Sequence, residues 1–152
     1  MNRDFVEMLS ALSEAGADFL VVGAHALAAH GIPRATGDID IWIRPTSENA
    51  QRVHQALAAF GAPLFDLSVS DLSQPGIVFQ IGVPPSRIDI LTGVTGLTFD
   101  AAWPRRISAN LMGLSVPIIR RDDFLANKRA TGRDKDLADI ALLSDQEETN
   151  TP

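Results

Sequence analysis

The chain has 152 residues, 45% of them hydrophobic and 21% charged, a composition typical of a globular domain with a sizeable core. It contains no cysteine, which excludes disulfides and thiolate metal sites, and no apolar run approaches the ~18 residues of a membrane span. The net charge of −6 argues against general nucleic-acid binding, although eight of the 13 basic residues fall between Arg105 and Lys135.

The first 60 residues alternate helical and extended patterns. Apolar residues from Phe5 to Leu12 recur with the period of an amphipathic helix, which Gly16 is placed to end. Phe19–Val22 is a short apolar run typical of a buried strand, and Gly23 then starts a tight turn. Three further elements are predicted: a short helix at 24–30, a strand at 37–44, and a helix that begins near residue 46 and ends at Gly61.

The rest of the chain predicts two hairpins and a helical end. Strands at 77–81 and 87–91 are joined so briefly, through Pro84-Pro85, that they should pair antiparallel. A second hairpin is expected at 106–118, turning near Met112-Gly113. The remaining elements are a loop or short helical turn at 70–76, a short helix at 99–103, and a last helical region that is capped by Asp122 or Asp123 and carries the apolar residues Phe124, Leu125, Leu137, Ile140, Leu142 and Leu143.

Together these patterns predict one α/β (α+β) domain over residues 1–145. Its sheet should be mixed and mostly antiparallel, with helices packed against it. Residues 146–152 are rich in acidic and polar side chains, and we expect them to form a disordered tail.

Two carboxylates interrupt the apolar strand at 37–44. Their i, i+2 spacing places Asp38 and Asp40 on one strand face and the intervening isoleucines on the other. Because like charges repel, the native state needs a cation beside them or a raised pKa. A bare pair of this kind is also typical of a solvated strand face. Oxygen ligands that converge from one face favour a hard divalent ion such as Mg²⁺.

Asp89 is a third candidate carboxylate. It lies in the middle of the strand at 87–91, with Arg87 on the same face. In a mixed sheet this strand can lie beside the one that carries Asp38 and Asp40. The alternative is that Asp89 simply pairs with Arg87.

The order of these motifs resembles that of a known family. Gly23 and a short helix, then Arg34-x-Thr36-x-Asp38-x-Asp40, then a later strand with Asp89, resemble the nucleotidyltransferase fold of the DNA polymerase beta superfamily. Residues 128–139 are similar to the Lys-x-x-Ala-x-x-Arg-x-Lys-Asp-h-x-Asp segment of its small bacterial branch, with one residue fewer. That branch of minimal nucleotidyltransferases is related to the toxins of abortive-infection and toxin–antitoxin systems. The resemblance spans residues 19–143.

The resemblance implies roles for the three carboxylates. In the family, the first two aspartates bind metal ions and the third helps to activate the acceptor hydroxyl, which makes Asp38, Asp40 and Asp89 both metal ligands and catalytic residues here. Three carboxylates can hold two ions ~4 Å apart, an arrangement that stabilises the attacking and leaving oxygens of a phosphoryl displacement. Mg²⁺ is the expected ion, with Mn²⁺ as the alternative.

The resemblance also implies a nucleotide site around these acids. Gly23 leaves room for a triphosphate to approach the backbone. Where the superfamily usually has glycine or serine next, this chain has Ala24, which removes a hydroxyl contact to phosphate. Arg34 and Thr36 either reach the phosphates or anchor their turn. The remaining phosphate-binding candidates are Lys128, Arg133 and Lys135, and the alternative for the last two is a solvated helix face paired with neighbouring aspartates.

The implied reaction is transfer of a nucleoside monophosphate from an NTP to an acceptor hydroxyl, with release of pyrophosphate. Two alternatives use the same residues: a catalytically silent binding partner and a two-metal phosphohydrolase. The expected partners are an NTP, an acceptor that is an RNA end, a protein or a small molecule, and an antitoxin protein, but no membrane. The chain begins without a basic stretch followed by an apolar one, so a cytoplasmic location is expected.

Overall fold

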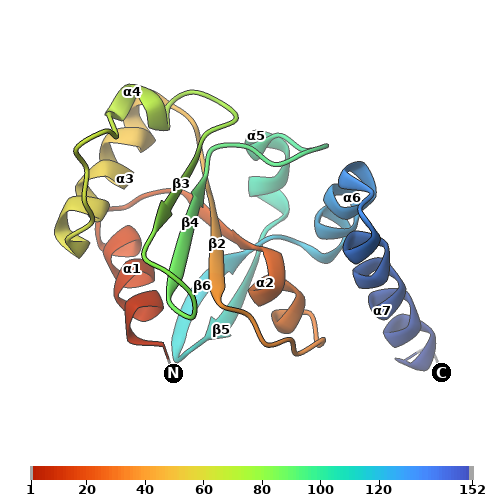
Figure 1. The fold of residues 1–152 in the computed structure, drawn as a ribbon. Helices are drawn as coiled ribbons and strands as arrows, with labels where there is room; N and C mark the ends of the chain where they lie inside the picture. The colour runs from red at the N-terminus through yellow and green to blue at the C-terminus, as the bar shows by residue number, and fades with distance from the viewer. Residues whose placement is uncertain (1, 151–152) are drawn as a thin grey trace.

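The computed structural model describes the backbone of residues 2–150 and the side chains of residues 2–145. The order of helices and strands follows the prediction, with small shifts of the boundaries (Figure 1). In chain order the elements are α1 (Arg3–Glu14), β1 (Phe19–Val22), α2 (Gly23–Ala29), β2 (Asp38–Ile43), α3 (Ser47–Phe60), α4 (Val69–Leu72), β3 (Val78–Ile81), β4 (Arg87–Leu91), α5 (Phe99–Ala102), a 3-10 turn (Trp103–Arg105), β5 (Ile107–Leu111), β6 (Leu114–Ile118), α6 (Arg121–Thr131) and α7 (Asp134–Asn150).

The six strands of the described chain form one sheet in the order β3-β4-β2-β1-β6-β5. The two predicted hairpins lie at its opposite edges, where β3 pairs antiparallel with β4 and β5 with β6. At the centre β1 and β2 are antiparallel, whereas β2–β4 and β1–β6 are parallel pairs. The prediction of a mixed, mostly antiparallel sheet is therefore confirmed.

One face of the sheet carries most of the apolar core. It is covered by α1 and α3, which lie side by side (Figure 1). The isoleucines that alternate with the acids of β2 are fully buried and belong to the same core cluster as the apolar stripe of α1. Burial of each such side chain stabilises the fold by about 1.5–3 kcal/mol. Because this face is fully apolar, strand alternation leaves the carboxylates of β2 on the other face, toward α2 and α6.

The predicted last helical region is two helices rather than one. The break lies at Gly132, whose φ of 63° ends α6 in the left-handed conformation that favours glycine. The predicted cap at Asp122 or Asp123 is wrong, because Arg120 is the N-cap residue and both aspartates lie within the first turn. Asp123 is instead buried in an ion pair with Arg105, at 2.8 Å between Oδ1 and Nη2.

The end of the chain is helical in its backbone as far as Asn150. The predicted disordered tail at 146–152 falls on side chains and residues that lie outside the described part of the structure. Of the helices in the described chain, none combines the length and the apolar character that crossing a bilayer requires.

Candidate active site

The three predicted carboxylates meet on one face of the sheet. β2 and β4 are parallel neighbours in a register that pairs Asp40 with Asp89 and Asp38 with Arg87. Each of the three aspartates offers one carboxylate oxygen, and these oxygens all lie within 4.8 Å of one another. This spacing agrees with the expectation from strand geometry, and it is compact enough for one hard cation to contact all three side chains.

Arg87 is the cation that lies beside two of these carboxylates. Its Nη2 donates to Oδ2 of Asp38 at 2.5 Å and to Oδ2 of Asp89 at 3.2 Å, and its Nε donates to Oδ1 of Asp89 at 3.1 Å. Thr36 adds a hydrogen bond from its hydroxyl to Oδ1 of Asp38 at 2.8 Å. Asp89 therefore pairs with Arg87 and also belongs to the acid cluster, so the two arrangements that the sequence offered as alternatives occur together.

Asp40 is the carboxylate without such compensation. Among the ion pairs of the described side chains, none includes Asp40, and the more distant charge of Lys128 offsets its environment only in part. Burial, followed by the negative charges of Asp38 and Asp89, raises the pKa of Asp40 to about 7. The cluster therefore has both features that were expected of crowded acids: a cation at Asp38 and Asp89, and at Asp40 a raised pKa, to which burial contributes most.

The structure gives a reason for glycine at position 23 other than the access for a triphosphate that we inferred from the sequence. Its φ is 67°, and a Cβ added there would overlap Oδ2 of Asp40. The missing side chain therefore makes room first for the Asp40 carboxylate. Gly23 also lines the cavity described below. That it gives a triphosphate access to the backbone stays a prediction. Ala24 follows in the first turn of α2 and is not among the lining residues.

Two predicted cations face the acids from the junction of α6 and α7. Lys128 is nearly buried, with its Nζ 3.4 Å from Oδ1 of Asp136 and 3.9 Å from Oδ2 of Asp139. Arg133 donates from Nε to Oδ2 of Asp136 at 2.7 Å. Burial opposes the charge of Asp136, but the hydrogen bonds from Arg133 and Thr131 and the charge of Lys128 outweigh it and hold the pKa of Asp136 well below its usual value.

The other predicted phosphate-binding residues lie elsewhere. Nη1 of Arg34 is 2.5 Å from Oδ1 of Asp139 in an ion pair whose angles do not make a hydrogen bond. Arg34 thus fastens the loop before β2 to α7, which agrees with the anchoring alternative. Lys135 is exposed on α7 and does not line the cavity.

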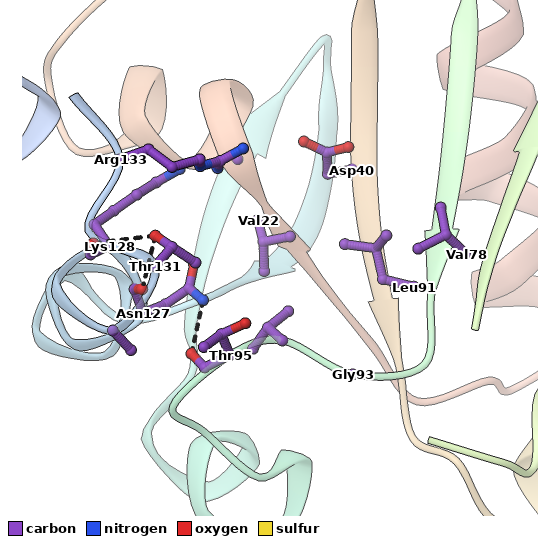
Figure 2. Close-up of a pocket in the computed structure, with 13 residues that line it drawn as sticks. Val22, Asp40, Val78, Leu91, Gly93, Thr95, Asn127, Lys128, Thr131 and Arg133 are labelled. Atoms are coloured by element: carbon purple, nitrogen blue, oxygen red, sulfur yellow. Dashed lines mark hydrogen bonds between the residues drawn. The ribbon is translucent and has the colours of Figure 1, made fainter. Parts of the chain in front are cut away.

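A cavity of about 640 Å³ lies between the acid face of the sheet and α6 (Figure 2). Asp40 is the triad member that lines it, and Lys128 and Arg133 lie on the opposite wall. Its volume is within the ordinary range for a small-molecule site. The full set of lining residues is Val22, Gly23, Asp40, Val78, Leu91, Gly93, Val94, Thr95, Asn127, Lys128, Ala130, Thr131 and Arg133.

Sequence reasoning missed the loop that closes the cavity after β4. Nδ2 of Asn127 donates to the carbonyl oxygen of Thr95 at 2.8 Å, which fastens this loop to α6. A Cβ at Gly96 would lie 2.6 Å from Cβ of Ala130, so only glycine allows the loop to approach the helix this closely. The glycines of Gly93-x-x-Gly96, directly after a strand, could have revealed this loop from the sequence. Gly96 marks a close contact between the loop and α6 rather than a phosphate loop.

Similar folds include a proposed nucleotidyltransferase from Thermotoga maritima, with a TM-score of 0.61 and 13% identity over 95% of this chain and 92% of that one. A nucleotidyltransferase-like antigenic protein from Paracoccidioides brasiliensis gives a TM-score of 0.49 and 20% identity over 93% and 75%. No curated protein sequence matches. A family model described as "Nucleotidyl transferase of unknown function (DUF2204)" matches residues 1–150. This match over nearly the whole chain, on a fold of the expected kind, shows that the protein belongs to that nucleotidyltransferase family.

Proposed function

We propose that this protein transfers a nucleoside monophosphate from an NTP to an acceptor hydroxyl and releases pyrophosphate, with the help of a divalent cation. One observation carries the proposal: Asp40, a member of the carboxylate triad, and two cations, Lys128 and Arg133, lie on facing walls of one cavity. A metal-bound triphosphate needs both kinds of partner, because its phosphate oxygens bind cations and its metal ion binds carboxylates.

The donor set fits a hard divalent cation. It consists of carboxylates from Asp38, Asp40 and Asp89, and the pKa of Asp40 is raised by burial and then by the negative charges of the other two acids. When bound there, Mg²⁺ or Mn²⁺ would stabilise the charge that develops on the phosphoryl oxygens.

The residues of the chain then have separate tasks. Lys128 and Arg133 bind the phosphates that leave as pyrophosphate, and their aspartate partners hold them toward the cavity. Asp89, oriented by two hydrogen bonds from Arg87, takes up the proton of the acceptor hydroxyl. The hydroxyl oxygen forms a bond to the α-phosphorus while the bond from that phosphorus to the bridging oxygen breaks.

Labelled nucleotides test which bond is broken. Nucleotidyl transfer passes α-label from an NTP to an acceptor in total RNA or lysate and releases γ-label as pyrophosphate. Release of γ-label as orthophosphate, without α-label transfer, would instead indicate a two-metal phosphohydrolase. NTP binding without either change would indicate a silent binding partner. Asp40→Asn should abolish the signal, whereas Asp122→Asn, at an exposed carboxylate on α6, should leave it unchanged.

A role as a toxin, in the cytoplasm where NTPs are abundant, is the cellular form of this proposal, and its support is the resemblance of residues 128–139 alone. Induced expression of the wild-type protein should then arrest bacterial growth, and Asp40→Asn should not. Equal growth of the two strains, at equal protein levels, would exclude this role while leaving the transfer reaction open.

A further inference from the structure

The cavity has two chemically different sides. Figure 2 shows Lys128 and Arg133 reaching in from the α6 side, while Val78 and Leu91 project from adjacent strands on the other side. Val78 of β3 pairs with Leu91 of β4, so the two side chains are cross-strand neighbours on the face that also carries Asp89. We name Val78 and Leu91 the apolar shelf.

The apolar shelf lies next to the carboxylates, farther along the strand that carries Asp89. Leu91 follows Asp89 by two positions on β4, a distance of about 7 Å along an extended strand. A group bound at the carboxylates through a phosphate can therefore reach the shelf across one sugar ring. Val94, from the loop after β4, extends the apolar lining.

Val78 is the unusual member of the shelf. Its side chain is 58% exposed on an edge strand, and it lines the cavity rather than the core. Leu91 beside it is also incompletely buried. An open apolar surface within reach of a charged site is suited to the flat, apolar face of a heteroaromatic ring.

From this arrangement we propose that the apolar shelf of Val78 and Leu91 binds the base of the nucleotide, an inference that rests on the proposed function. The phosphates then lie between Asp40 and the two cations, and the base lies over β3 and β4. The charged residues of the cavity lining are Asp40, Lys128 and Arg133, and all three are engaged at the phosphate end. The shelf therefore recognises the flat face of the base, a feature that ATP, GTP, CTP and UTP share.

The test compares ATP with inorganic tripolyphosphate, each titrated calorimetrically with Mg²⁺ into wild-type protein and three variants. Val78→Ser removes apolar surface from the shelf. Val83→Ser is the matched control, because Val83 is an even more exposed valine, at 73%, in the connection between the same two strands. Val78→Thr keeps the shape and strand preference of valine, and melting curves of all variants confirm folding.

The expected result is that Val78→Ser weakens ATP binding by about threefold to tenfold and leaves tripolyphosphate binding unchanged. Val83→Ser should change neither affinity, and Val78→Thr should give a smaller loss for ATP. Equal binding of ATP and tripolyphosphate by the wild-type protein, or equal effects of Val78→Ser on both ligands, would overturn the shelf while leaving a phosphate site in place. Failure of both ligands to bind wild-type protein would overturn the proposed function and the shelf together.

Discussion

At the scale of single residues, the site is defined by how unevenly its charge is balanced. Arg87 serves two carboxylates at once, and Thr36 adds a hydroxyl to one of them. Asp40 has neither of these two partners, and its carboxylate lies so close to Gly23 that a Cβ there would overlap it. Burial and then the charges of Asp38 and Asp89 raise the pKa of Asp40, and a bound cation would offset both causes by favouring the ionised carboxylate.

Asp40→Asn should stabilise the metal-free protein at pH 8. The folded-state pKa, near 7, lies above the ordinary value of 3.8, so the folded protein holds this proton more tightly than the unfolded chain. Folding stability therefore falls as the pH rises from about 4 to about 7, and the penalty is fully present above that range. Removing the charge should recover on the order of 2 kcal/mol at pH 8 and almost nothing at pH 4.

Urea denaturation of both proteins at the two pH values measures this difference. Asp122→Asn is the control, since its carboxylate is exposed and its loss should change stability by less than about 0.5 kcal/mol. A gain for Asp40→Asn that is the same at pH 4 and pH 8 would show that charge is not its cause.

Gly23→Ala and Gly16→Ala separate backbone strain from the contact with Asp40. Both glycines have φ near 70°, but a Cβ at Gly16 meets nothing within 4 Å, whereas one at Gly23 meets the Asp40 carboxylate. Each substitution should cost about 1 kcal/mol for the left-handed backbone, and Gly23→Ala should cost roughly 1–3 kcal/mol more. Equilibrium unfolding of the two variants gives the comparison, and equal losses would show that Asp40 moves aside without cost.

At the scale of elements, the junction of α6 and α7 positions Lys128 and Arg133, the two cations that line the cavity. The left-handed turn at Gly132 brings the start of α7 back against α6, so that Asp136, fully buried, meets Lys128, Thr131 and Arg133. Arg34 extends the network to the loop before β2 through Asp139. The cations are thus held by a helix pair, whereas the acids are held by the sheet.

Asp136→Asn should weaken this junction strongly. It leaves Lys128 nearly buried without its closest anion, at a cost of roughly 2–4 kcal/mol in the free energy of unfolding. Asp134→Asn, at an exposed position in the same first turn of α7, is the matched control and should change stability by less than about 0.5 kcal/mol. Chemical denaturation measures both, and similar values for the two variants would contradict the anchoring role of Asp136.

At the scale of the whole molecule, the sequence predicted what depends on local patterns. Strand periodicity placed the acids on one face, and the shortness of the connections predicted both hairpins. The sequence did not reveal that Arg87 serves Asp38 as well as Asp89, because that contact depends on the parallel register of two strands far apart in the chain. The break at Gly132 was missed because a glycine within a charged segment carries no apolar periodicity. The apolar shelf was missed because nothing in the sequence distinguishes Val78 from a strand valine that faces the core.

The whole fold should respond to ligand through the acid triad. Millimolar Mg²⁺ together with ATP should raise the melting temperature of the wild-type protein, because a ligand that binds the native state alone stabilises it. Asp38→Asn should abolish the rise. Mg²⁺ without ATP should have a smaller effect, since Arg87 already balances two of the three carboxylates. A melting temperature indifferent to Mg²⁺ and ATP together would count against a nucleotide site.

The placement of the cations on α6 and α7 has a consequence for the order in which the site forms during synthesis. All six strands of the described sheet precede Lys128 and Arg133 in the chain, and the acid triad is complete once β4 has emerged. A nascent chain that has folded its sheet therefore carries the carboxylates before the facing wall exists. At that stage Arg87, which lies on β4, already balances Asp38 and Asp89, whereas the cations that face Asp40 are still missing. Lys128 and Arg133 face Asp40 only once α6 and α7 have formed.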